Sequence, residues 1–141
     1  AALPGLRTAV TDRAILRAMH FISENQRVQD QVNALKKGAF KRFLSLVKAS
    51  GDSSFKWLQN VYTPQTPQKQ GIALALALTE KYIAEIGEGA CRIHGGGFAG
   101  TILVFLPASA VPAYRQRMSA VFGPKSVVEL KIRSEGVVRL C

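Results

Sequence analysis

Residues Ala90 to Leu106 read ACRIHGGGFAGTILVFL, and this stretch decides the fold. Its two apolar segments, Ala90–Ile93 and Thr101–Leu106, contain the β-branched and aromatic side chains that favour strands. The connector between them holds glycine at four of six positions, from Gly95 to Gly100. The stretch therefore predicts two strands joined by a glycine loop.

The glycine loop has backbone amides that no side chain shields from a ligand or another segment. Without Cβ atoms, successive amides can turn toward one point and hold an anion, or let a ligand or another backbone approach closely. A wide turn with a bulge would use the same residues and bind nothing. The loop does not match a P-loop, because no Gly-Lys-Ser or Gly-Lys-Thr follows, nor a dinucleotide fingerprint, because a strand comes next.

Helical patterns precede this unit. The first helix begins near Thr11 or Asp12, whose side chains can cap free amides, and it ends at Gly38. Its apolar residues recur every three or four positions and are Ile15, Met19, Ile22, Val28, Val32 and Leu35. A second helix has a core face formed by Phe40, Phe43, Leu44 and Val47. The turn Ser50-Gly51-Asp52 then precedes a short helix with Phe55, Leu58 and Val61.

The segment Gly71–Ile86 has two interpretations. Its apolar residues alternate as in a strand at Ile72, Leu74, Leu76 and Leu78. Alanine and leucine are strong helix formers, however, and the run is long for a strand. We expect a buried helix.

The C-terminal patterns complete the fold class. They predict a helix over Val111–Phe122, a strand over Ser126–Ile132 and a further candidate strand over Val137–Leu140. Nothing in Ala1–Val10 predicts the initial strand that a split βαββαβ motif needs. We expect one domain over residues 1–141 with an α+β fold, in which helices pack on one face of a small antiparallel sheet.

The composition is that of an ordinary globular protein, with 48% apolar and 20% charged residues. The longest apolar run, Ile72 to Leu78, is too short to cross a bilayer, and we expect a soluble, cytoplasmic protein without membrane contacts. The net charge of +10 suits a polyanion such as nucleic acid, but its even spread along the chain favours a solvated surface. Cys91 and Cys141 match no disulfide or metal-ligand spacing, so we expect reduced thiols and no metal.

Two separated segments resemble the galactokinases of the GHMP kinase family. Residues 90–101, ACRIHGGGFAGT, resemble the third motif of that family, where a small residue, an arginine and a hydrophobic residue lead into Gly-Gly-Gly-Phe-Gly-Gly. His94 and Ala99 depart from it, because threonine and glycine are usual there. Residues 20–28, HFISENQRV, are similar to a family helix written His, three residues, Glu-Asn, any residue, Arg-Val. Weaker likenesses, in collinear order, are Ser54-Phe55 with Leu58 and Val61, and Lys131-Ile132-Arg133-Ser134 with Gly136.

The resemblance implies a ferredoxin-like C-terminal domain of a galactokinase, an enzyme that transfers the γ-phosphate of ATP to the anomeric hydroxyl of galactose. The partner is then the N-terminal half of the same kinase, with ATP, Mg²⁺ and galactose in the cleft between the halves. The family's Gly-Leu-Ser-Ser-Ser phosphate loop and its aspartate near the sugar lie in that other half. We therefore expect no catalytic residue here, no cofactor bound to this chain alone and an inactive fragment.

The same resemblance gives the glycine loop a place in the cleft. The third motif packs against the phosphate loop, so the cleft wall is formed by Gly95, Gly96, Gly97, Phe98 and Gly100. An exposed domain interface would also let the isolated chain self-associate.

Several polar and aromatic residues have two interpretations. Arg92 and His94 share a strand face and either clamp an anion or point toward solvent and neighbouring hydrogen bonds. His20, Glu24 and Arg27 either serve the family's helix or form surface pairs three and four residues apart. The aromatic side chains that either stack on a base or sugar or pack in the core are Trp57 and Tyr62.

Three hypotheses of function follow. The first is the C-terminal domain of a galactokinase-like kinase. The second is a stand-alone α+β ligand-binding or interaction module without catalysis. The third, a nucleic-acid binder, rests on the charge of +10 alone and is the weakest.

Overall fold

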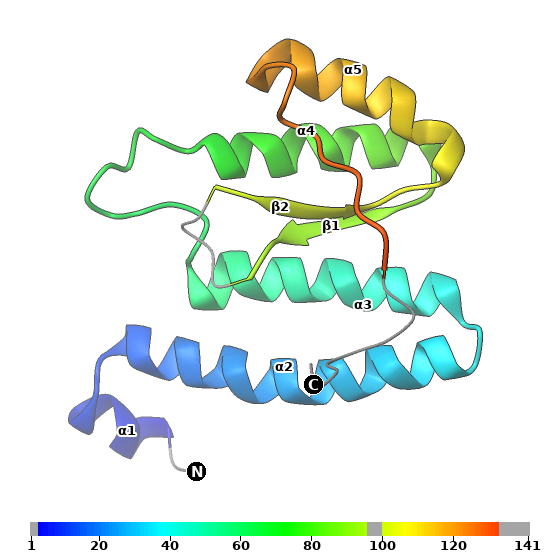
Figure 1. The fold of residues 1–141 in the computed structure, drawn as a ribbon. Helices are drawn as coiled ribbons and strands as arrows, with labels where there is room; N and C mark the ends of the chain where they lie inside the picture. The colour runs from blue at the N-terminus through cyan, green and yellow to red at the C-terminus, as the bar shows by residue number, and fades with distance from the viewer. Residues whose placement is uncertain (1–2, 96–99, 133–141) are drawn as a thin grey trace, which may run out of the picture. The chain divides into compact units, whose positions relative to one another are not determined.

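A computed structural model describes residues 3–95 and 100–132 and divides the chain into two units, Ala1–Ala108 and Ser109–Cys141. The first unit contains α1 (Leu3–Ala9), α2 (Asp12–Lys36), α3 (Phe40–Ser53), the π-helical turn η1 (Ser54–Leu58), α4 (Gly71–Ile86), β1 (Ala90–Ile93) and β2 (Ile102–Phe105) (Figure 1). The 3-10 turn η2 (Ala108–Ala110) precedes α5 (Val111–Phe122) of the second unit. A single domain over residues 1–141 stays a prediction.

The two predicted strands form an antiparallel hairpin. Ala90 lies opposite Phe105 and Ile93 lies opposite Ile102. Beyond the last pair, the backbone amide of His94 donates a hydrogen bond to the Thr101 carbonyl at 3.2 Å. The glycine loop therefore leaves the hairpin where strand pairing ends.

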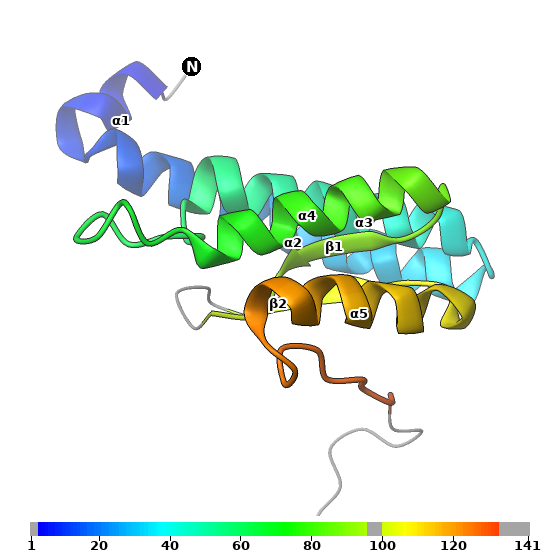
Figure 2. The same cartoon turned by 90° about the horizontal axis from the view of Figure 1, so that it is seen from above.

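Helices lie on both faces of this hairpin. Side chains alternate along β1, so Ala90 and Arg92 face α3, whereas Cys91 and Ile93 face α4. Two views place the hairpin between α3 and α4, with α2 on the outer side of α3 (Figures 1 and 2). The α+β class is confirmed. The prediction that helices pack on one face of the sheet is wrong, because each face of β1 carries apolar residues that helices cover.

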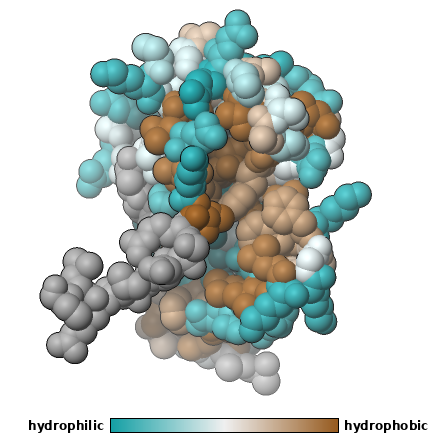
Figure 3. Space-filling view, turned by 45° about the vertical axis from the view of Figure 1, so that its right-hand side comes forward, coloured by the Kyte–Doolittle hydropathy of each residue, from teal (hydrophilic) through white to brown (hydrophobic). Residues whose placement is uncertain are grey.

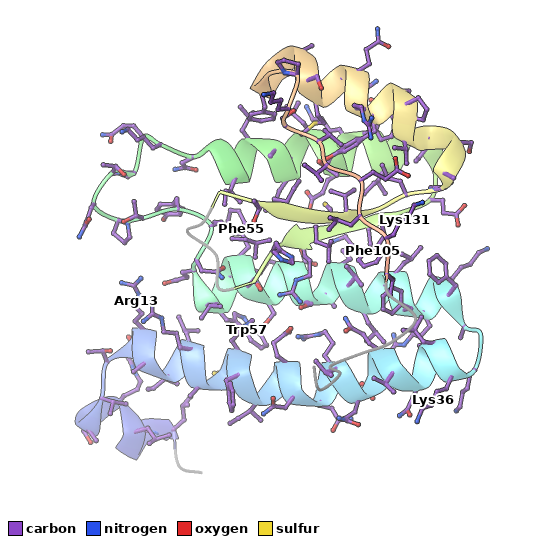
Figure 4. All side chains as sticks on the ribbon, in the orientation of Figure 1. Arg13, Lys36, Phe55, Trp57, Phe105 and Lys131 are labelled. Carbon is purple, nitrogen blue, oxygen red and sulfur yellow. The ribbon has the colours of Figure 1, made fainter. Side chains whose placement is uncertain are left out.

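Two apolar clusters form the core of the first unit. The cluster on the α4 side consists of Val61, Leu76, Cys91 and Ile93, with Ile72, Ile83, Ile102 and Val104 packed against it. The cluster on the α3 side consists of Leu44, Val47 and Ala90, with Phe43 and Phe105. Phe43 and Phe105 meet edge to face, with ring centroids 5.4 Å apart. Figure 4 shows Phe105 on the side of the hairpin that faces α3.

Several helix boundaries follow from local chemistry and are confirmed. Thr11 caps α2, because its side-chain oxygen accepts a hydrogen bond from the Ala14 amide at 3.3 Å. Gly38 follows α2 with a φ of 64°, and Gly87 ends α4 with a φ of 76°. The helix over Gly71–Ile86 is confirmed, and the strand interpretation of this segment is excluded.

The predicted turn at Ser50-Gly51-Asp52 is wrong, because α3 continues to Ser53. Gly51 lies where α3 meets β1. A Cβ atom at Gly51 would lie 3.1 Å from the Cys91 carbonyl oxygen and 3.2 Å from the Arg92 Cβ atom. This glycine therefore permits close packing of helix on strand and does not mark a turn.

The two ends of the chain also differ from expectation. Leu3–Ala9 forms the short helix α1, which the sequence did not predict. The predicted strand over Ser126–Ile132 is wrong, since this segment has no regular secondary structure, and Val128, Leu130 and Ile132 are exposed. An alternating pattern becomes a strand only when a neighbouring strand supplies hydrogen bonds, and none of the described residues does so. The candidate strand Val137–Leu140 lies outside the described residues.

Candidate functional site

A cluster of polar side chains lies where α2, α3 and β1 meet. Its members, which we call the polar cluster, are His20, Glu24 and Arg27 of α2, Ser50 and Ser53 of α3, and Arg92 of β1. Buried polar groups are retained in folded proteins when they satisfy one another. The polar cluster joins the two segments that resemble galactokinases, which are 62 residues or more apart in the sequence.

Glu24 is the centre of the polar cluster. The Ser50 hydroxyl donates a hydrogen bond to the Glu24 carboxylate, and Arg92 Nη1 donates to Ser50 Oγ at 2.5 Å. Arg92 Nη1 also lies 3.7 Å from Glu24 Oε2, and Arg27 forms an ion pair with the other carboxylate oxygen. One carboxylate thus faces two guanidinium groups, and the polar cluster carries an excess positive charge.

These charged groups lie in partly buried positions. The exposed side-chain fractions are 18% for Glu24, 16% for Arg27 and 25% for Arg92, and Ser50 is fully buried. Burial lowers the pKa of Arg92, and burial followed by the charge of Arg92 lowers the pKa of Arg27. Glu24 and Arg27 do form the expected pair three residues apart, but it is partly buried and does not lie on the surface.

His20 extends the polar cluster along α2. Its Nδ1 atom lies 2.9 Å from Ser53 Oγ in a buried hydrogen bond. Burial, then the charges of Arg27 and Arg92, lower the pKa of His20, while the contact with Ser53 raises it. We therefore assign the neutral imidazole to His20 at pH 7.

Protonation of His20 is expected to make the folded chain less stable in mild acid. Folding lowers the pKa of His20 from its ordinary value of 6.5. Below about pH 6.5 the imidazole is therefore protonated in the unfolded chain before it is protonated in the folded chain. The free energy of unfolding should then fall between pH 7.5 and pH 5, as measured by urea unfolding. The His20→Gln variant should show a smaller fall, whereas the His94→Gln control should keep it. An equal pH dependence in both variants would contradict the assignment.

The structure describes the ends of the predicted glycine loop. Gly95 and Gly100 have φ angles of 57° and 81°, in the region that disfavours other residues. Gly96, Gly97 and Phe98 lie outside the described residues. His94 is exposed and Arg92 belongs to the polar cluster, so their joint role as an anion clamp stays a prediction.

Ser50 and Ser53 were missed from the sequence. Their signal was present as the small polar run Ser50-Gly51-Asp52-Ser53-Ser54, which interrupts an otherwise apolar helix face. The run nevertheless predicts a turn, because glycine and aspartate are common in turns. The hydroxyl of Ser54 is buried and has no hydrogen-bond partner among the described residues.

The other candidate residues, Trp57, Tyr62 and Cys91, are not members of the polar cluster. Trp57 is half-buried in η1, beside α2 (Figure 4), and Tyr62 is exposed, so their stacking role stays a prediction. Burial raises the pKa of the free Cys91 thiol to about 12, which keeps it protonated. Among residues 3–95 and 100–132, no three His, Cys, Asp or Glu side chains are placed to hold a metal ion, and no helix is long and apolar enough to span a membrane.

Galactokinases are among the known proteins similar to this chain. A galactokinase of Mannheimia succiniciproducens is 34% identical over 109 residues, which cover 77% of this chain and 26% of the relative. A galactokinase of Haemophilus influenzae strain PittEE is 35% identical with the same coverage. No family model and no solved structure matches the chain. The chain spans about a quarter of the length of these relatives and is homologous to galactokinases over most of its own length.

Proposed function

We propose that this chain is the C-terminal, loop-bearing part of a galactokinase-like sugar kinase. The observation that carries the proposal is the polar cluster, which brings Glu24 and Arg92 together from the two segments that resemble galactokinases. Losing either partner would leave a partly buried charge without its counter-ion, so the two segments depend on each other in the folded chain. The reaction proposed for the whole kinase is transfer of the ATP γ-phosphate to the anomeric hydroxyl of galactose.

The role of this chain in that reaction is to hold the wall of the cleft. Arg92 lies three residues before Gly95, and its Nε atom donates a hydrogen bond to the Ile93 carbonyl at 3.0 Å. The guanidinium thereby ties the end of β1 to α2 and α3 through Glu24 and Ser50. A fixed strand end gives the glycine loop a fixed starting point, which matters because phosphoryl transfer depends on positioning.

The other half of the kinase would supply the groups that act on ATP. ATP with Mg²⁺ supplies the phosphoryl group and neutralises its charge when bound. The excess positive charge of the polar cluster suits a neighbouring anion. Its one carboxylate, Glu24, is not free for a metal ion, because it already faces two guanidinium groups. We assign ATP and Mg²⁺ binding to the combined halves and no catalytic residue to this chain.

Reconstitution of the two halves tests this proposal. The chain would be co-purified with the whole part of the Mannheimia succiniciproducens galactokinase that it does not match, and ATP-dependent phosphorylation of galactose would be measured. We expect activity from the pair and none from either part alone. Activity should fall about tenfold or more when Gly100→Ala distorts the end of the loop, since Gly100 has a φ of 81°.

The matched control is Gly71→Ala, because Gly71 begins α4 and has open space around it. This variant should keep the activity of the pair. A pair that associates but phosphorylates no sugar would contradict the kinase proposal and favour a binding module without catalysis.

A further inference from the structure

Helix α2 buries polar residues and exposes several apolar ones. The side that faces α3 carries the polar residues His20, Glu24 and Arg27 together with the buried Ala34. Away from that side the helix exposes polar residues and also the apolar residues Met19, Phe21, Ile22, Val28, Val32 and Leu35. Phe21 and Ile22 keep 65% and 69% of their surface exposed, which is a large apolar exposure for one helix.

The exposed residues follow a regular spacing. Steps of four and three residues connect Ala14, Ala18, Phe21, Asn25, Val28, Val32 and Leu35, and each of these residues is exposed. We call these seven residues the outer seam. Such spacing keeps side chains along one line of a helix and is the pattern by which helices pack in coiled coils. We therefore expect the partner of the outer seam to be another helix, not a flat surface such as a sheet.

We propose that the outer seam is a dimer interface at which α2 pairs antiparallel with α2 of a second copy of this chain. Asn25 is the middle position of the seven. A two-fold axis at Asn25 places Phe21 of one copy opposite Val28 of the other. It also places large side chains opposite small ones, since Leu35 lies against Ala14 and Val32 lies against Ala18. The seam is thus complementary to itself, and the asparagine amides can bond each other across the axis.

One flank of the seam also favours a second copy in this direction. Its residues are apolar in the first half of α2, at Ile15 and Ile22, and polar in the second half, at Gln29 and Lys36, whereas the other flank is polar throughout, at Arg17, Glu24 and Gln31. An antiparallel pair brings Lys36 of one copy beside Ile15 of the other, where the aliphatic stem covers apolar surface. The backbone dipoles of the two helices then point in opposite directions, which is favourable.

The available area is sufficient for a dimer. A helix of 25 residues is about 37 Å long and about 11 Å wide, so its outward half presents roughly 640 Å². Two copies would bury about 1,300 Å², which lies within the range of specific interfaces, about 1,200 to 2,000 Å². Figure 3 shows apolar side chains at the surface among hydrophilic ones on the face it views. The inference does not depend on the proposed kinase function.

Sedimentation equilibrium of the chain tests the dimer. We expect a monomer to dimer equilibrium in the micromolar range, with the dissociation constant raised more than about tenfold by Phe21→Lys or Val28→Lys. The control is Phe55→Lys, which changes an exposed aromatic residue of η1 outside the seam and should leave the dimer intact. Circular dichroism of each variant would verify that the helices remain folded.

Cross-linking tests the direction of the pair. In a Cys141→Ser background, a mixture of Ala18→Cys and Val32→Cys chains should form the mixed disulfide faster than either variant forms a disulfide with itself. A faster Ala18→Cys homodimer would indicate parallel helices and overturn the proposal. A chain that stays monomeric at about 200 μM, or that uses the seam only to bind the N-terminal half of a kinase, would also overturn it.

Discussion

Replacement of Arg92 by alanine is expected to lower the free energy of unfolding by about 2 to 3 kcal/mol. The variant leaves the Glu24 carboxylate with a single cation and removes the donor that Arg92 Nη1 directs at Ser50 Oγ. Removing one partner of a fully buried ion pair costs more, about 3 to 5 kcal/mol, and the partial exposure of Arg92 reduces this figure. Urea unfolding at pH 7 measures the change.

The matched control for this prediction is Lys48→Ala on the same helix as Ser50. Lys48 and Asp52 form an ion pair at 3.0 Å, but their side chains are 63% and 42% exposed. The loss should stay below about 0.5 kcal/mol, because exposed pairs are screened by solvent. A double-mutant cycle with Glu24→Gln and Arg92→Ala should show coupling between the two sites. Additive losses would exclude a Glu24–Arg92 interaction.

Replacement of Gly89 by alanine is expected to be the most destabilising small substitution in the chain, at about 3 kcal/mol or more. Gly89 has a φ of 134°, and an added Cβ atom would lie 2.8 Å from the Phe105 carbonyl oxygen and 3.0 Å from Leu106 Cδ2. The carbonyl belongs to the backbone of β2, so it cannot move without disturbing the hairpin. Thermal and urea unfolding would measure the loss.

Gly87→Ala separates backbone strain from steric overlap in this comparison. Gly87 ends α4 with a φ of 76°, but a Cβ atom there would meet nothing within 4 Å. Only the left-handed conformation is penalised, at about 1 kcal/mol. If the two variants lost equal stability, close packing of Gly89 against β2 would not be the cause of its effect.

The polar cluster shows how far motifs alone can locate a site. Glu24 and Arg92 were visible as members of two family-like segments, yet nothing local indicated that they form one ion pair. Ser50, which connects them, was assigned to a turn because its neighbours are common turn residues. A contact between distant segments depends on how α2 and α3 pack, and a linear pattern holds no information about that packing.

Helix α2 illustrates the same limit in its packing. Its length and both ends were predicted, because capping by Thr11 and the conformation of Gly38 are local properties. Its apolar spacing predicts a helix but does not say which side of the helix is buried. In the first unit the side that carries His20 and Glu24, together with Ala34, is the buried one, since Glu24 and His20 find partners on α3 and β1 there. Hydrophobic spacing identifies a face that needs cover without identifying what covers it.

By itself, the sequence determined the elements whose causes lie within a few residues: the strands over Ala90–Ile93 and Ile102–Phe105, the helix over Gly71–Ile86 and the ends of α2. The likeness to galactokinases was also visible in the sequence, because each motif consists of residues that are consecutive in the chain. Tertiary structure alone decided that Gly51 serves close packing, that residues 126–132 form no strand, and that the side of α2 that carries Glu24 is buried. These outcomes depend on partners distant in sequence, whose desolvation and hydrogen bonds outweigh local propensity.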